Sequence, residues 1–152
     1  MEKRHAFFIA LIITLVIAGN WLFFQDFSEF EREKVVISRV LDGDTVELED
    51  GRRIRMLNIN AEEKARAWGK EAGDYLKEFE GEIVELEKEG IDSYGRTLGR
   101  IYFENYYLNL KLVELGLAHP YLVDENELKE FKKFEEKAKE QEIGIWKKSE
   151  HY

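Results

Sequence analysis

Short stretches in which apolar and polar residues alternate recur along the chain after residue 34. Alternation with a period of two, combined with many β-branched and aromatic residues, is typical of half-buried β-strands. The stretches with this pattern are residues 35–41, 45–49, 52–59, 82–89 and 96–103. The first three follow one another closely and predict a meander, whereas the last two predict a returning hairpin.

Other stretches repeat their apolar residues every three or four positions, which predicts amphipathic helices over residues 64–79, 105–116 and 124–142. Residues 117–123 predict an extended connection, and Gly144–Trp146 is expected to pack the tail back onto the domain. The order of three strands, a helix, two strands and two helices predicts an α+β fold that is mainly β. We expect a five-stranded OB-fold β-barrel capped by three helices.

The first predicted hairpin gathers several oxygen-bearing side chains. An Asp-Gly turn signal separates the second and third predicted strands. Because a hairpin brings its two outer ends together, Asp42 and Asp44 are expected to lie near Asn60 and Glu63. A corner that offers carboxylate and amide oxygens, with Arg55 on the adjoining strand, can hold a hard cation and a phosphate.

Arg55 lies on a strand that adjoins this corner. Strand alternation places Arg55 on the same face as Leu57 and Ile59, opposite Ile54 and Met56, so its side chain is expected to be partly buried. A buried guanidinium is costly without an anionic partner. A phosphate ligand and a neighbouring acid are the two partners that this pattern leaves open.

The N-terminal part of the chain differs from the rest, because residues 6–24 are apolar and uncharged and follow Lys3 and Arg4. This length predicts a transmembrane helix that anchors the protein. A signal peptide cleaved near residues 16–18 is the alternative, although the apolar run continues beyond that point to Phe24.

The predicted organisation is a membrane anchor or signal segment at residues 1–24, a linker at 25–34 and a soluble domain at 35–152. Lys3 and Arg4 favour a cytoplasmic N-terminus. The domain is therefore expected outside the cytoplasm as part of a single-pass cell-membrane protein, or secreted if the segment is cleaved. Residues 6–24 contact the membrane in this prediction, and no protein partner is inferred.

Composition narrows the possible chemistry. The 152 residues include no cysteine, which excludes disulfides, thiolate zinc sites and cysteine nucleophiles. The formal net charge of −9 argues against a protein that coats DNA nonspecifically, because phosphate binding relies on Lys and Arg. A nuclease with a locally basic site remains compatible with this charge.

Several motifs occur in a familiar order. They are DGDT at residues 42–45, RMLNINAEE at 55–63, SYGR at 93–96, ELGLA at 114–118 and GIW at 144–146. Together they resemble the staphylococcal nuclease (thermonuclease) family over nearly all of residues 35–147. The resemblance implies a five-stranded OB barrel with three helices that hydrolyses DNA and RNA phosphodiesters with one calcium ion.

The resemblance also assigns a metal site. Asp44 is similar to the family's first carboxylate ligand, and Asp42 lies beside it. Asn60 stands where the family has its second aspartate ligand. Ala61 stands where a threonine supplies a backbone carbonyl, which alanine supplies equally well.

The catalytic assignments follow in the same way. Glu63 matches the glutamate that orients or deprotonates the attacking water. Arg55 and Arg96 match the two arginines that hold the phosphate and stabilise its transition state, and a guanidinium can donate to phosphate oxygens in a bidentate way. Tyr94 and Tyr121 are candidates for stacking on a base or sugar of the substrate, with core packing as the alternative.

The match departs from the family at one strand end. The family reads Asp-Thr-Pro-Glu where this chain reads Asn60-Ala61-Glu62-Glu63. One ligand charge is lost, so calcium binding is expected to weaken. Losing the proline is expected to free the loop that aims Glu63. Two hypotheses follow: a calcium-assisted nuclease, or a catalytically weakened OB-fold module that binds nucleic acid or protein at the membrane.

Overall fold

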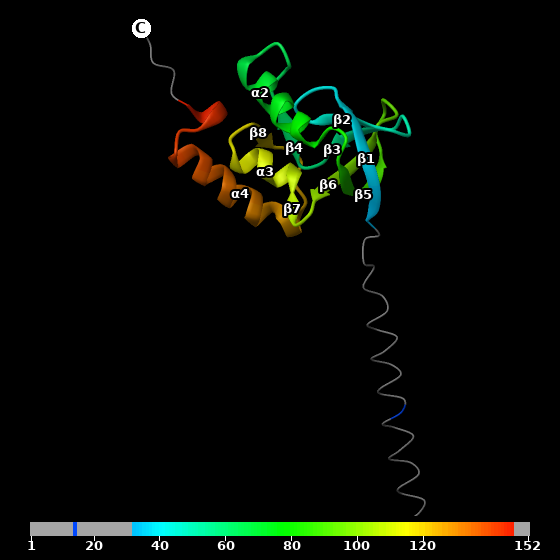
Figure 1. Cartoon of the computed structure of the whole chain (residues 1–152). Helices are drawn as coiled ribbons and strands as arrows, with labels where there is room; N and C mark the ends of the chain where they lie inside the picture. The colour runs from blue at the N-terminus through cyan, green and yellow to red at the C-terminus, as the bar shows by residue number, and fades with distance from the viewer. Residues whose placement is uncertain (1–13, 15–31, 148–152) are drawn as a thin grey trace, which may run out of the picture. The chain divides into compact units, whose positions relative to one another are not determined.

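A meander of three antiparallel strands begins the fold in the computed structural model, which describes residue 14 and residues 32–147 (Figure 1). The strands are β1 (Glu33–Val40), β2 (Thr45–Leu48) and β3 (Arg53–Met56). The register pairs Arg39 with Glu47 and Glu47 with Arg53, after a bulge in β1. The alternating pattern therefore predicted these three strands, although β3 is shorter than the predicted residues 52–59.

Two further strands close the sheet into a barrel. β5 (Ile83–Ile91) pairs antiparallel with β1 and with β6 (Thr97–Phe103). β6 then pairs parallel with β3, so the row of five strands returns to its beginning. A short strand, β7 (Tyr106–Tyr107), extends the sheet beyond β6. The predicted five-stranded barrel is confirmed.

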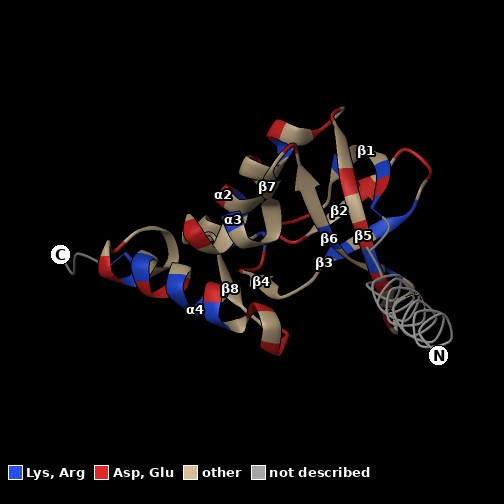
Figure 2. Ribbon diagram, turned by 90° about the horizontal axis from the view of Figure 1, so that it is seen from below, with Lys and Arg blue, Asp and Glu red and all other residues tan. Residues whose placement is uncertain are grey.

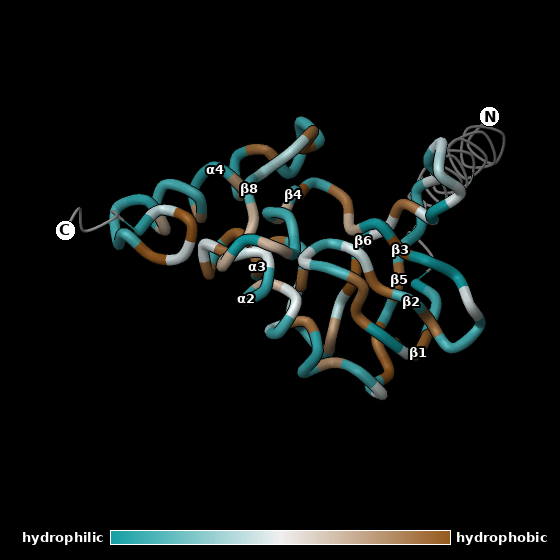
Figure 3. The backbone as a smooth tube through the Cα atoms, turned by 90° about the horizontal axis from the view of Figure 1, so that it is seen from above, coloured by the Kyte–Doolittle hydropathy of each residue, from teal (hydrophilic) through white to brown (hydrophobic). Residues whose placement is uncertain are grey.

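The barrel interior is apolar because every barrel strand turns alternate side chains inward. Figure 3 shows polar and apolar segments alternating along these strands. Each fully buried aliphatic side chain contributes about 1.5–3 kcal/mol relative to an exposed one. Side chains from each of the five strands that are almost wholly buried include Ile37, Val46, Ile54, Leu86 and Ile101.

The three predicted helices are present and lie on one side of the barrel (Figure 1). They are α2 (Ala67–Leu76), continued by the 3-10 turn η1 (Lys77–Phe79), α3 (Leu108–Glu114) and α4 (Glu125–Glu140). A second 3-10 turn, η2 (Gly144–Trp146), follows α4. α2 begins later than predicted because the backbone is still extended at Arg66, with φ −91° and ψ 154°.

The third predicted strand, residues 52–59, is wrong in one respect, because a turn interrupts it. Asn58 has a φ of 65°, in the left-handed region that asparagine tolerates better than most residues. The chain resumes as β4 (Ile59–Ala61), which pairs antiparallel with β8 (Ala118–Pro120) in a separate two-stranded sheet. Ile59 therefore does not share the face of Arg55 but enters the core.

The predicted apolar segment at residues 6–24 lies outside the described residues. Within the part of the chain that the structure describes, no helix combines the length and apolar character needed to cross a bilayer. β1 begins at Glu33, whereas the predicted domain begins at Val35.

Candidate active site

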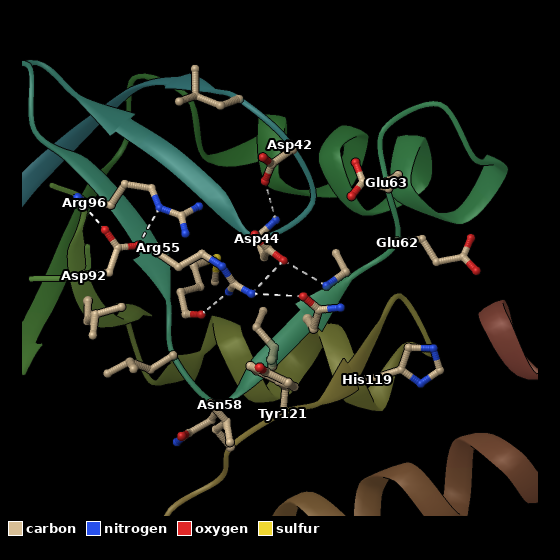
Figure 4. Close-up of a pocket in the computed structure, with 18 of the residues that line it drawn as sticks. Asp42, Asp44, Arg55, Asn58, Glu62, Glu63, Asp92, Arg96, His119 and Tyr121 are labelled. Carbon is tan, nitrogen blue, oxygen red and sulfur yellow. Dashed lines mark hydrogen bonds and ion pairs between the residues drawn. The ribbon is translucent and has the colours of Figure 1, made fainter. Parts of the chain in front are cut away.

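A cavity of about 880 Å³ opens where the turn before β2, the end of β3, β4 and the start of β6 meet (Figure 4). It collects most of the candidate residues from the sequence. The predicted site residues that line it are Asp42, Asp44, Arg55, Asn60, Ala61, Glu63, Arg96 and Tyr121. The structure therefore confirms the prediction that the outer ends of the hairpin lie close together.

The turn before β2 fixes two carboxylates at the cavity. Asp42 Oδ1 accepts a hydrogen bond from the Asp44 backbone N–H at 3.0 Å. The hydroxyl of Thr45 donates to Asp44 Oδ1 at 3.1 Å. Short-range hydrogen bonds of this kind are why Asp and Asn favour turns. The sequence Asp-Gly-Asp-Thr thus holds the Asp44 side chain in one orientation.

Asp44 also joins Arg55 and β4 in one hydrogen-bond network. Asp44 Oδ2 accepts from the Ala61 backbone N–H at 2.9 Å and lies 3.2 Å from Arg55 Nη2. The same Nη2 donates to Asn60 Oδ1 at 3.2 Å, and Nη1 donates to the Met56 carbonyl at 2.6 Å. The anionic partner of Arg55 within the protein is therefore a neighbouring acid.

Burial raises the pKa of the Asp44 carboxyl above its usual range. The Arg55 guanidinium and the Ala61 N–H act in the opposite direction, whereas the nearby Asp42 raises the pKa further. Removing water from a carboxylate disfavours its charged form. A cation at this position therefore stabilises Asp44 in the form that can also bind a metal ion.

Glu63 lies in the segment between β4 and α2, with its side chain exposed at the cavity. Its backbone is held firmly. The Arg66 N–H donates to the Glu63 carbonyl at 2.8 Å. A Cβ atom on Gly69 would lie 2.3 Å from the Glu63 oxygen and 2.4 Å from that of Glu62. Helix α2 therefore packs directly against the carbonyls of this loop, whereas the expectation that losing the proline frees the loop stays a prediction.

Arg96 approaches the cavity from the loop before β6. Its Nε donates to Asp92 Oδ2 at 2.8 Å. Asp92 Oδ1 also accepts from the backbone N–H groups of Tyr94 and Arg96. Although burial raises the pKa of Asp92, the hydrogen bonds from the Arg96 backbone and side chain outweigh it and hold that pKa below its usual range. Asp92 thus orients Arg96, and the Nη1 and Nη2 atoms of Arg96 point away from Asp92 (Figure 4).

The two tyrosine candidates differ. Tyr121 lines the cavity, and its N–H donates to the Asn58 carbonyl at 2.9 Å. Tyr94 is not among the lining residues and is 84% exposed. The Arg96 guanidinium lies 5.4 Å from the centre of the Tyr94 ring. Tyr94 therefore contacts the site through Arg96, whereas Tyr121 forms part of its wall.

The oxygens available to a metal ion are few. Among the described residues, no group of three or more acidic or histidine side chains is arranged to hold a metal. Asp44 Oδ2 and Asn60 Oδ1 converge on one positively charged nitrogen of Arg55, each at 3.2 Å. Both are hard oxygen donors of the type that calcium prefers. The donor chemistry of these two oxygens therefore fits a calcium ion.

Asp92 and His119 are among the cavity residues that the sequence patterns did not identify as site residues. Asp92 is the first residue of an Asp-Ser-Tyr-Gly turn, so its place in a turn was apparent from the sequence, although its approach to the cavity was not. His119 lies opposite Asn60 in the pairing of β4 with β8. A pairing between two three-residue strands carries no periodic signal, so His119 was not predictable.

Comparison with known proteins places this site in a family. The model for "Staphylococcal nuclease homologue" matches residues 53–148. The chain belongs to the staphylococcal nuclease family. It is 31% identical over 152 residues to the micrococcal nuclease of Shigella flexneri, covering 90% of this chain and 82% of that protein. It is 26% identical over 154 residues to the thermonuclease of Staphylococcus intermedius, covering 92% of each.

A family relative in Bacillus subtilis, endonuclease YhcR, is much longer. It is 31% identical to this chain over 139 residues, which cover 76% of this chain but only 11% of the relative. This match therefore concerns one part of YhcR. Members of the staphylococcal nuclease family thus include both proteins of this size and larger proteins that contain the same segment.

Proposed function

We propose that this protein is a nuclease that hydrolyses phosphodiester bonds of DNA, RNA or both, assisted by calcium. The observation that carries the proposal is that Arg55, Arg96, Glu63 and Asp44 line one cavity in a member of the staphylococcal nuclease family. Two guanidiniums and two carboxylates come together there from four separate segments of the chain. The nuclease names of the relatives support the same activity.

Each of these residues has a role that its surroundings support. Glu63, with an exposed carboxylate, accepts a proton from the water that attacks phosphorus. Arg96 is held through Nε, so its Nη1 and Nη2 donate to phosphate oxygens. Arg55 adds positive charge beside the same oxygens. Phosphoryl transfer depends mainly on positioning and on stabilising charge in the transition state, which these groups provide.

Asp44, Asn60 and the Ala61 carbonyl are the residues that would hold calcium, with Asp42 beside them. When bound, the ion polarises the phosphate and lowers the pKa of a bound water. Arg55 Nη2 lies where the oxygens of Asp44 and Asn60 converge, so these oxygens would have to exchange this guanidinium for the ion. Arg55 would then be available to the phosphate of the substrate.

One observation favours a second candidate function. Asp44 Oδ2 already binds the Ala61 N–H and Arg55, and Asn60 lacks the charge that would compete with this arrangement. A protein that keeps this network in solution binds nucleic acid in the cavity without cutting it efficiently. The second candidate is a catalytically weakened binding module.

Hydrolysis of single-stranded DNA by the purified full chain, in detergent, tests the proposal. The reaction is followed with calcium and with a chelator, from neutral to alkaline pH. We expect cleavage that requires calcium. Binding of the same DNA without calcium-dependent cleavage at any pH would support the second candidate and overturn the first.

We also propose that the domain works outside the cytoplasm. The support is the apolar run at residues 6–24 preceded by Lys3 and Arg4. Cell fractionation and protease treatment of intact cells test this. Protection of the domain from external protease, together with its release in the cytosolic fraction, would contradict the proposal.

A further inference from the structure

Two arginines on the outer face of the barrel share one carboxylate. Arg39 Nη2 lies 3.0 Å from Glu47 Oε1, and Arg53 Nε lies 3.4 Å from Glu47 Oε2. The three residues lie on neighbouring strands β1, β2 and β3, paired directly across the sheet. Glu47 therefore holds both guanidiniums on the same face.

These two arginines remain available to a ligand. The side chains of Arg39 and Arg53 are each 61% exposed, whereas that of Glu47 is 22% exposed. Two positive groups and one negative group leave a net positive charge on this cluster of three residues. Exposed ion pairs of this kind add little to stability, so exchanging Glu47 for another anion would cost the fold little.

The face leads directly to the cavity. Arg53 precedes Arg55 by two residues on β3, which places both side chains on the same face about 7 Å apart. The parallel pairing of Ile54 with Thr97 places the start of β6, and hence Arg96, beside Arg53. Arg39 lies about 10 Å from Arg53 because one strand separates them.

The arginines thus form a row that we name the arginine path, made of Arg39, Arg53, Arg55 and Arg96. Figure 2 shows Lys and Arg gathered around β3 and β6, whereas along α4 they alternate with acids. In a chain with a formal net charge of −9, such a row is a local exception. A flexible polyanion is the ligand whose charge matches a row of arginines across a sheet.

We infer that Arg39 and Arg53 bind phosphates of the nucleic-acid strand that continues beyond the cavity, across β3, β2 and β1. This inference rests on the proposed function, because it extends the binding of the same substrate. The path adds affinity for long strands and contacts no part of the scissile phosphate. Glu47 serves as a positioning residue that keeps the two guanidiniums apart and facing outward.

Binding in the presence of a chelator separates this inference from catalysis. The full chain is titrated into fluorescently labelled single-stranded DNA, either long enough to cross the sheet or only three nucleotides long, and anisotropy is measured. The double variant Arg39→Gln, Arg53→Gln is compared with the wild type. Lys129→Gln, Lys132→Gln on α4 is the matched control, since it removes the same charge from exposed residues elsewhere.

We expect the arginine variant to bind the long strand roughly five- to tenfold more weakly. The slope of log Kd against log salt falls by about 1.4, which corresponds to two phosphate contacts on a single strand. Affinity for the trinucleotide stays at the wild-type value, and the lysine variant binds both DNAs like the wild type. Unchanged melting temperatures show that both variants are folded.

Three results would overturn the inference. The first is wild-type affinity of the arginine variant for the long strand. The second is an equal loss of affinity for the trinucleotide, which would show that the cavity itself is altered. The third is an equal loss in the lysine variant, which would show a general effect of charge.

The proposed function is tested by a different measurement. If the wild type cleaves DNA and the arginine variant binds the long strand normally, the nuclease proposal stands and the role of the arginine path is rejected. Binding that depends on Arg39 and Arg53, in a chain that does not cleave, would keep the path and reject the nuclease. A wild-type chain that binds neither DNA would reject both.

Discussion

Arg55 and Asp44 form an ion pair, 3.2 Å between Nη2 and Oδ2, in which the side chains are only 14% and 12% exposed. The same guanidinium nitrogen donates to Asn60, so one arginine joins two of the proposed calcium ligands. We therefore expect the charge of these ligands to affect whether a metal ion can replace Arg55 between them.

Replacing Asn60→Asp restores a second carboxylate at this point. We expect tighter calcium binding, by roughly tenfold or more, because affinity depends on the ligand charge count. Faster cleavage at limiting calcium follows for the same reason. Calcium titrations of activity and calorimetry measure both effects.

Asn126→Asp is the control for this change, because it adds the same charge to an exposed position on α4. It is expected to leave the calcium dependence of cleavage unchanged. A weaker calcium affinity or slower cleavage in Asn60→Asp would show that the metal assignment is wrong.

Glu63→Gln tests the proposed general base. The amide cannot accept the proton of the attacking water, so kcat is expected to fall by about 10²- to 10⁴-fold with little change in DNA binding. Glu62→Gln is the neighbouring control and is expected to remain within a few-fold of the wild type. Single-turnover cleavage of labelled DNA measures both, and full activity of Glu63→Gln would remove this residue from the mechanism.

Gly69→Ala tests whether α2 positions Glu63. A Cβ atom at this site would meet the carbonyl oxygens of Glu62 and Glu63 at 2.4 and 2.3 Å, so the segment must shift. A displacement of about 1 Å can reduce the rate roughly a hundredfold, and we expect kcat to fall while KM changes little.

Gly73→Ala is the matched control in the same helix. Its Cβ would meet nothing closer than 3.8 Å, at the Asp42 backbone. Activity is expected to be retained, with a gain of roughly 0.8–1 kcal/mol in stability from the higher helix propensity of alanine. Equal activity of the two glycine variants would show that Gly69 does not position Glu63. Rate constants and thermal unfolding separate these outcomes.

The alternation of apolar and polar residues predicted much of this fold, as individual residues of β3 illustrate. The alternation that buries Ile54 and Met56 while exposing Arg53 is a property of the strand itself. The turn signals at the ends of β2 act over a few residues. Because these signals predict a hairpin, the approach of Asp44 to Asn60 was accessible from sequence.

The features that sequence did not predict depend on contacts between distant segments. Asn58 breaks the third strand because β4 pairs with β8, some sixty residues later in the chain. The role of Gly69 follows from the close approach of α2 to the Glu62 and Glu63 carbonyls. The ion pair of Arg55 with Asp44 requires both the hairpin and the turn at Asn58. None of these contacts produces a repeating pattern in the sequence.

Arg100→Ala is expected to destabilise the fold by about 3 kcal/mol, because it leaves the buried Glu87 and the partly buried Glu127 without this guanidinium. The Arg100 side chain is 7% exposed. Its ion-pair partners from β5 and the start of α4 are Glu87, Glu89, Asp124 and Glu127. Urea unfolding measures the loss. Arg39→Ala, which breaks an exposed pair, is the comparison and is expected to cost at most about 1 kcal/mol.

A smaller effect for Arg100→Ala than for Arg39→Ala would contradict this account. It would mean that the carboxylates around Arg100 are solvated in the variant.

Glu33 gives a stability effect that depends on pH. Hydrogen bonds from Arg52 and Lys88 lower the pKa of Glu33 from 4.5 to about 2. The folded state therefore favours the charged carboxylate. Its stabilising contribution is present above pH 4.5 and is lost as the pH falls through about 2.

Glu33→Gln should therefore lower the melting temperature at neutral pH, with a difference from the wild type that shrinks below pH 4.5 and vanishes near pH 2. Calorimetry at several pH values checks this. A difference that grows as the pH falls would reverse the sign of the effect and contradict the assignment.

The parallel pairing of β3 with β6 has a consequence for the growing chain. Arg55 enters the site from β3 and Arg96 from the residue before β6, and Asn60 is paired with His119 on β8. A ribosome makes these segments in order, so the two arginines cannot meet until the chain has passed β6. The cavity wall stays incomplete until β8 has emerged. A nascent chain therefore lacks the complete cavity until the segment that carries His119 and Tyr121 has been synthesised.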